Sequence, residues 1–473
     1  MRREPALRVA DGAAQNSRHG SEGLRFAVDP APWALWEAVV VFAAAAVVCL
    51  VATRFMSPMI THNGLDDIWF ESDMVRSYRG LFDRHWNQIF PAKHPMYAMV
   101  SWLIITPIHA IVASKIESLN IMLALNAGVF TALLSRILAY DGVARVERFA
   151  VAAVTVASSA FWMWFTVPDK FAFAATTLLI GIYPLARAQA GRTVPLWQWV
   201  VCAAASFSIT VTNFIAGGVA ALTRALLVAP DDRLFPLSLT ARIRSVALIL
   251  AAAAALVGVG SLTQNRLYPG SGLMFSPHAL AIEGDYMFRY DVSSLAARVQ
   301  TLIVQPVVMG VPGRAGPTRR TNGRYGELDA RQKVDGKWPG TSYGRAAAAI
   351  WVALLGIGVW AALRPATRTP IGIAAAAMVA WQFGLHLVYG EQAFLYMAHF
   401  LPFDMILLAK ARLPLRRPIF VGLCALLAVT AALNSVDGLR AASAISDAMG
   451  RDLIAQASAP DASPRLAASV LRP

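Results

Sequence analysis

Residues 33–53, WALWEAVVVFAAAAVVCLVAT, decide the class of fold. The stretch holds a single charged residue, Glu37, and a helix of about 20 residues at 1.5 Å each crosses the hydrocarbon core of a bilayer. Similar stretches recur at 95–113, 119–139, 149–166, 171–186, 197–213, 215–229, 245–263, 346–363, 370–389, 393–410 and 418–434. The nearly continuous run 197–229 is either one long tilted helix or two helices joined at Thr212-Asn213. We predict an all-α, polytopic transmembrane helical bundle of about 11–12 hydrophobic segments.

The composition also indicates a membrane protein. Hydrophobic residues make up 57% of the 473 residues, charged residues only 15%, and the mean hydropathy is +0.52, whereas about a quarter of a soluble domain is charged. Cys49, Cys202 and Cys424 lie inside apolar runs, where a thiol is usually a small hydrophobic side chain. The net charge of +14 reflects basic residues in short loops beside apolar runs, so it predicts topology and no nucleic-acid partner. The excess of Arg over Lys favours a bacterial inner (cytoplasmic) membrane.

Polar stretches divide the chain into five parts. We expect a cytoplasmic N-terminal tail, an N-terminal transmembrane module with an acidic first outer loop at 54–94, a large outer loop, C-terminal transmembrane helices and a C-terminal tail. Their bounds are 1–32, 33–263, 264–345, 346–434 and 435–473. The Gly- and Arg-rich stretch 313–345 is typical of a mobile loop, and the tail after Ala455 of a disordered segment.

The basic loops constrain the number of crossings. If every segment crosses and the N-terminal tail is inside, the later arginine-rich loops fall outside, against the positive-inside rule. Removing one crossing before residue 140 places all of them inside. The segment 95–113 is the best candidate, because it carries Pro107 and His109 and a very short connection to the next segment. We expect it to be re-entrant or interfacial; the alternative is a plain span with a weak charge bias.

The first outer loop carries the most distinctive polar sequence, GLDDIWFESDMVR at 64–76. Four carboxylates fall within eight residues: Asp66, Asp67, Glu71 and Asp73. Clustered acids repel one another, so a divalent cation such as Mg²⁺ or Mn²⁺, or a proton to be abstracted, would explain the grouping. The alternative is a solvated acidic loop held by local ion pairs, such as Asp73 with Arg76 at i,i+3.

This arrangement resembles the GT-C superfamily of polytopic glycosyltransferases with a polyprenyl-phosphate sugar donor, and within it the protein mannosyltransferase and aminoarabinose transferase group. Asp66-Asp67-Ile68-Trp69-Phe70 is similar to a D-E-x-aromatic-aromatic motif, and Glu71-Ser72-Asp73 to a D-x-D/E-x-D motif. Lys93-His94-Pro95-Met96-Tyr97 is similar to a His-Pro-Pro-Leu-Tyr-like motif, with Met replacing the second Pro. Asp169 stands where the family has a further acid. The motifs cover the first 190 residues; the rest is similar only in architecture.

The resemblance implies a transfer site at the outer face. Asp67 or Asp73 would be the general base, with Asp66 and Glu71 as alternates or metal ligands. The residues implied on the substrate and phosphate side are Arg76, Lys93, His94, Asp169 and Lys170. The alternatives are that Lys93 and His94 anchor a helix start at the membrane interface, and that Asp169 and Lys170 form an ion pair in a tight turn.

A second polar cluster joins two late segments. It contains Glu391 in the turn, with Tyr396 and His399 at i,i+3 on the following helix. Polar groups at membrane depth usually face a cavity, so we expect this cluster to form the far wall of the site and to contact sugar or phosphate. The alternative is an aromatic belt around one buried, hydrogen-bonded histidine.

The function that these patterns favour is transfer of a sugar from a polyprenyl-phosphate donor to a glycan, lipid or protein acceptor at the outer face. A secondary transporter or flippase is an alternative, but such proteins usually carry polar groups mid-helix and internal repeats, which this sequence lacks. A polysaccharide polymerase or ligase is another, since those rely on basic outer loops. The sequence has no P-loop or G-x-G-x-x-G motif for a nucleotide. A divalent cation is the one cofactor that the acidic cluster suits.

Overall fold

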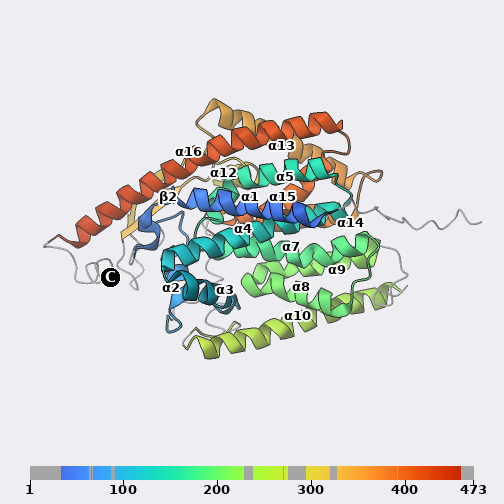
Figure 1. The fold of residues 1–473 in the computed structure, drawn as a ribbon, viewed down its shortest axis with the longest axis horizontal. Coiled ribbons are helices and arrows are strands. Elements are labelled where there is room, and N and C mark those ends of the chain that lie inside the picture. Colours follow the sequence, from blue (N-terminus) through green and yellow to red (C-terminus); the bar gives the residue numbers. More distant parts are fainter. Residues whose placement is uncertain are drawn as a thin grey trace, which may run out of the picture.

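The protein is a bundle of helices with one short strand pair (Figure 1). The structure, a computed structural model, describes residues 33–62, 65, 68–86, 91–227, 238–269, 271–274, 294–319, 328–390 and 392–459. The elements of the first half are α1 (Leu35–Thr53), η1 (Pro58–Thr61), α2 (Met74–Phe82), α3 (Tyr97–Val112), α4 (Lys115–Tyr140), α5 (Arg145–Ala157), α6 (Ser159–Trp164), α7 (Lys170–Gln189), α8 (Leu196–Ile209), η2 (Val211–Asn213), α9 (Phe214–Leu227) and α10 (Leu239–Leu267). Those of the second half are α12 (Leu295–Val304), β1 (Gly313–Arg319), β2 (Leu328–Lys333), α13 (Ser342–Leu363), α14 (Pro370–Val388), η4 (Ala393–Tyr396), α15 (Met397–Lys410) and α16 (Arg417–Ala457).

The predicted all-α transmembrane bundle is confirmed. Each predicted hydrophobic segment coincides with one or two helices, and eight helices of the described chain are long and apolar enough to cross a membrane. Several begin at a side-chain cap, as helices in proteins commonly do. Ser114, Asp169, Ser238, Thr341 and Thr369 each accept a hydrogen bond from a backbone N–H in the first turn of α4, α7, α10, α13 and α14.

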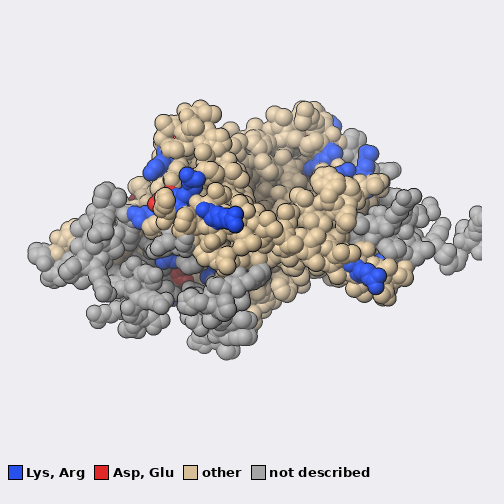
Figure 2. All heavy atoms as spheres, turned by 90° about the horizontal axis from the view of Figure 1, so that it is seen from below, with Lys and Arg blue, Asp and Glu red and all other residues tan. Residues whose placement is uncertain are grey.

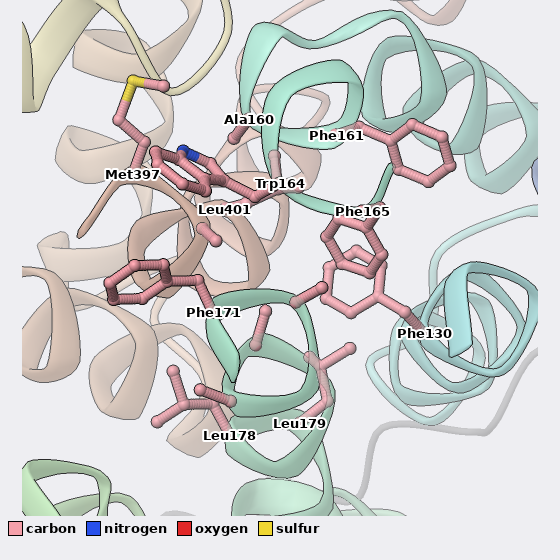
Figure 3. Close-up of a cluster of buried hydrophobic side chains, with 14 of the residues drawn as sticks. Phe130, Ala160, Phe161, Trp164, Phe165, Phe171, Leu178, Leu179, Met397 and Leu401 are labelled. Carbon is pink, nitrogen blue, oxygen red and sulfur yellow. The ribbon is translucent and has the colours of Figure 1, made fainter. Parts of the chain in front are cut away.

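The core lies where α4, α6, α7 and α15 meet. Figure 3 shows Phe130 of α4 beside Phe161 and Phe165, and Trp164 above Phe171 of α7. The segment made of η4 and α15 is central, with 94% of Ala393–Lys410 buried, whereas only 22% of the most apolar stretch of α10 is buried. The exposed leucines and valines of α10 therefore form part of the lipid-facing surface.

The helices α1 and α4 pack antiparallel. Arg136 lies over the Trp33 ring, and Gly128 faces Phe42, so α4 starts at the end of the bundle where α1 finishes. The chain between them leaves and returns at that same end. The helix α3 therefore does not add a crossing, as the charge distribution required.

Charged groups separate the two ends of the bundle. Figure 2 shows Lys and Arg gathered at both ends with an uncharged band between them. We call the end holding Asp73 and Lys170 the site end. At the opposite, arginine-rich end, Glu37 pairs with Arg145 and Arg148, and Lys410 pairs with Asp141. Within the described residues, the loops next to Gln189, Thr369 and Lys410 meet at this end, where all three side chains contact Asp141.

The run 197–229 forms two helices. Thr210 takes an extended conformation (φ −145°, ψ 125°) that ends α8, and η2 leads into α9. Asn213 is buried and donates to the carbonyl of Ala174 on α7. This settles the alternative left open by the sequence in favour of two helices, and it frees the last carbonyls of α8 for other partners.

The last helix, α16, continues well past residue 434, where the sequence analysis ended the final hydrophobic segment. Its second half packs against the antiparallel pair β1–β2 and η1. Gln332 of β2 donates to the Ala442 carbonyl and to Ser446. Part of 313–345, which we expected to be a mobile loop, is therefore ordered against α16. The stretch 435–457, which we assigned to a C-terminal tail, is helical.

Candidate functional site

Four charged side chains form a connected cluster at the site end. Lys170 Nζ lies 2.7 Å from Asp73 Oδ2 and 3.7 Å from Asp169 Oδ1, and Arg76 lies 3.1 Å from Asp73 Oδ1. Lys170 and Asp169 are buried, whereas the side chains of Asp73 and Arg76 are 27% and 20% exposed. The cluster thus runs from the interior of the bundle to its surface.

The aromatic half of the acidic motif holds the loop in place. Trp69 and Phe70 are fully buried, and the Trp69 indole donates to the Met163 carbonyl. Phe70 and Glu71 both have positive φ values, 50° and 63°. Residues other than glycine rarely adopt this backbone conformation, and where they do, they are often at functional sites. This turn brings Asp73 to the start of α2, where it meets Lys170.

Residues 93–96 dock into the break between α8 and α9. The Lys93 carbonyl accepts from Val211 N–H, and Met96 N–H donates to the Ser208 carbonyl. His94 Nδ1 lies 2.8 Å from the Ile209 carbonyl, so Nδ1 carries a proton and donates it. The Nε2 atom of a neutral His94 then holds a lone pair. The sequence analysis placed His94 among the residues that would bind substrate or phosphate. A neutral imidazole contributes no positive charge to such binding.

The electrostatics of the cluster separate its two aspartates. Burial alone would raise the pKa of Asp73, but the charges of Lys170 and Arg76 outweigh it and hold that pKa well below its usual value, with a smaller contribution from Lys93. Burial raises the pKa of Asp169 despite the neighbouring Lys170. Burial and Lys170 together lower the pKa of His94 well below its usual value. Asp73 is therefore ionised and His94 neutral at physiological pH.

The Asp73 carboxylate does not fit a divalent metal in this arrangement. Its two oxygens each accept from a cationic side chain, Arg76 and Lys170, and a divalent cation bound there would be repelled by both positive charges. Within the described chain no three His, Cys, Asp or Glu side chains are grouped as metal ligands would be. Asp66 and Asp67 lie outside the described residues.

The second polar cluster lies directly behind the first. Phe171, next to Lys170 in sequence, has its ring 5.9 Å from Tyr396 and 5.6 Å from His399. Phe70 of the acidic loop packs against Phe394 of η4, with ring centroids 4.6 Å apart. Phe171 thus separates Tyr396 and His399 from the charged cluster to which its neighbour Lys170 belongs. Glu391, the third predicted member, lies outside the described residues.

His399 does not have the hydrogen bond that the aromatic-belt alternative assumed. It is 1% exposed, and neither ring nitrogen has a hydrogen-bond partner in the described chain. The neighbouring His386 stacks on Tyr396 with centroids 3.7 Å apart. Gly390, with φ 85°, allows this turn, because a side chain there would meet the Tyr396 hydroxyl.

One residue of the site, Asp335, was missed by the sequence analysis. Its carboxylate accepts the N–H groups of Ala393 and Phe394 at 2.7 and 3.0 Å, and so fixes the start of η4. Burial raises the pKa of Asp335 to about 6, against the effect of these two hydrogen bonds. The signal available in the sequence was Asp335-Gly336, a turn dipeptide, which says nothing about its partner 58 residues away.

The fold is that of a polytopic helical membrane protein with a partly buried charged cluster at one end of its bundle. A crystal structure of ArnT from Cupriavidus metallidurans bound to undecaprenyl phosphate is similar to this chain. The TM-score is 0.51 at 13% sequence identity, over 90% of this chain and 82% of that one. No protein-family model and no curated protein sequence matches the chain.

Proposed function

We propose that this protein is a glycosyltransferase of a bacterial inner membrane that takes a sugar from a polyprenyl-phosphate donor. Its acceptor would be a glycan, lipid or protein at the outer face. The observation that carries the proposal is the Asp73–Lys170–Asp169 cluster, with Arg76 and Lys93, in a fold similar to one solved with undecaprenyl phosphate.

The cations of the cluster suit the leaving group. A polyprenyl phosphate leaves with negative charge, which preorganised basic side chains stabilise as the bond to the sugar breaks. Arg76, which pairs with Asp73, and Lys93, whose charge also acts on Asp73, add positive potential at the site end that would favour a phosphate. Both are partly exposed at the site end.

The carboxylates suit the sugar side of the reaction. The anomeric carbon gains positive charge in the transition state, and an ionised Asp73 beside it would lower the energy of that charge. A carboxylate whose pKa is held low is a weak proton acceptor. We therefore assign proton removal from the acceptor to Asp67 or Asp66 of the same loop, and electrostatic stabilisation to Asp73.

A binding experiment tests the donor site. The full chain in nanodiscs is titrated with undecaprenyl phosphate, and wild type is compared with Arg76→Gln/Lys93→Gln. We expect at least a tenfold weaker affinity in the double variant, because two charge-assisted contacts to phosphate are lost.

The matched control removes the same charge at the arginine-rich end. Arg364 and Arg416 are both exposed there, and Arg364→Gln/Arg416→Gln should bind like wild type. Equal weakening in both double variants would mean that the lipid senses only net charge, and the site would be misplaced. No binding by wild type would favour a transporter or flippase.

Transfer itself is tested with Asp73→Asn, which keeps the shape of the side chain and removes its charge. Release of undecaprenyl phosphate from a glycosylated undecaprenyl phosphate is measured in the presence of a bacterial envelope extract as acceptor. We expect a loss of about 100-fold or more in turnover, with binding of bare undecaprenyl phosphate retained. Wild-type turnover in this variant would remove Asp73 from the mechanism.

A further inference from the structure

Four nitrogen atoms between α14 and α15 are buried without a hydrogen-bond partner among the described residues. They are Gln382 Nε2, His386 Nδ1, and both ring nitrogens of His399. The three side chains are 0%, 1% and 1% exposed. Buried polar atoms in proteins are nearly always paired, and a polar group at membrane depth marks a site where something else supplies the partner.

These atoms belong to one site. The rings of His386 and His399 are 6.1 Å apart, and each lies within 6.2 Å of Tyr396. Phe171 closes the side next to Lys170, at 5.6 Å from His399. Figure 3 shows Phe171 projecting outward from α7, below Trp164. Tyr396 is partly exposed, whereas the two histidines packed against it are buried.

The group offers both hydrogen-bond donors and hydrogen-bond acceptors. His386 Nε2 lies 3.0 Å from Gln382 Oε1, which can only accept, so Nε2 carries the His386 proton and Nδ1 is left as an acceptor. Gln382 Nε2 offers donors. A neutral His399 offers one donor and one acceptor. An anionic phosphate only accepts hydrogen bonds, so it would be repelled by the two imidazole lone pairs of this group. Two or more neighbouring hydroxyl groups, each of which donates one proton and also accepts, can satisfy these donors and acceptors.

We propose that Gln382, His386 and His399 form a subsite for the hydroxyl groups of a sugar ring, with Tyr396 and Phe171 as its aromatic walls. The inference rests on the proposed function and replaces the sugar-or-phosphate role expected for His399 with a sugar role alone. These hydrogen bonds and aromatic contacts could hold either the sugar of the donor lipid or a sugar of the acceptor.

The donor arm of the test uses the full chain in nanodiscs. Bare undecaprenyl phosphate is compared with undecaprenyl phosphate carrying glucose, mannose or galactose. Wild type should bind one glycosylated lipid about tenfold more tightly than the bare lipid. His399→Phe should abolish that preference and change the dissociation constant of the bare lipid by less than about twofold, since one lost hydrogen bond to a ligand costs about tenfold.

Two further variants separate hydrogen bonding from packing. His399→Gln keeps a donor and an acceptor and should restore much of the preference. Phe403→Leu perturbs another fully buried residue of α15 and should leave the preference intact. Gln382→Leu should reduce the preference as His399→Phe does, which keeps the test valid if one variant fails to fold.

The acceptor arm uses protein saturated with bare undecaprenyl phosphate and titrated with methyl glucoside, methyl mannoside or methyl galactoside. Loss of binding in His399→Phe in either arm supports the subsite and identifies which sugar it holds. Unchanged preferences in both arms would mean that water alone fills the site, and equal weakening of bare and glycosylated lipids would mean a structural role; either result overturns the inference. Failure of wild type to bind any lipid would instead reject the proposed function.

Discussion

Asp335 is the residue whose protonation should be visible in the stability of the protein. Burial raises its folded-state pKa to about 6, above the unfolded value of about 3.9. The folded chain therefore binds this proton more tightly than the unfolded chain. The resulting stabilisation is complete below about pH 4 and is lost as the pH rises through 6, by up to about 3 kcal/mol.

The measurement is the melting temperature of wild type and Asp335→Asn in detergent across this range. Asparagine keeps one acceptor for η4 and cannot titrate. The wild-type melting temperature should fall relative to the variant between about pH 4 and pH 7. Parallel curves of melting temperature against pH would contradict the prediction. They would mean that the charges of Arg298 and Glu71, the neighbours of Asp335, offset the effect of its protonation on stability.

At the scale of elements, one glycine sets the distance between α13 and α15. A Cβ on Gly358 would lie 2.0 Å from the Leu407 carbonyl oxygen, so the backbones must separate to admit any side chain. Gly358→Ala should lower the free energy of unfolding by about 1–3 kcal/mol. Gly356, two residues earlier, has open space around it, and Gly356→Ala should be neutral or stabilising by up to about 1 kcal/mol.

Thermal or detergent-induced unfolding of the two variants checks this close approach. Because both add one methyl group to the same helix, helix propensity and composition are matched. Equal stability of the two variants would mean that α13 and α15 are not tightly packed at Leu407.

The elements themselves were largely predictable from the sequence, whereas their long-range contacts were not. Apolar length identifies a crossing helix without knowledge of its neighbours, and local spacing gave the Asp73–Arg76 and Asp169–Lys170 pairs, found at 3.1 and 3.7 Å. The Asp73–Lys170 contact joins residues 97 positions apart. No periodicity encodes such a pair, and its strength decides which aspartate is ionised.

At the scale of the whole molecule, the two charged ends predict the orientation in the membrane. The arginine-rich end should face the cytoplasm and the site end the outside. His85 is exposed near α2, and Ala366 is exposed in the turn between α13 and α14. The three native cysteines are buried, so an introduced cysteine can be labelled selectively.

A membrane-impermeant maleimide checks the orientation in intact spheroplasts. His85→Cys should react before lysis, and Ala366→Cys only after it. The opposite pattern would place the Asp73 cluster at the cytoplasm. Reaction of both before lysis would mean that the ends are not on opposite sides.

The helix α16 has a consequence beyond its contacts. With 41 residues it extends about 60 Å, roughly twice the hydrocarbon thickness of a bilayer. Its first half is the membrane anchor, and its second half supports the strand pair and, through Gln332, the turn that carries Gln392. The tilt of a transmembrane helix depends on the thickness of the bilayer. Because α16 is one continuous helix, a change in tilt of its first half also moves its second half. In a bilayer of different thickness, a change in the tilt of α16 would therefore displace the strand pair and the turn at Gln392 together.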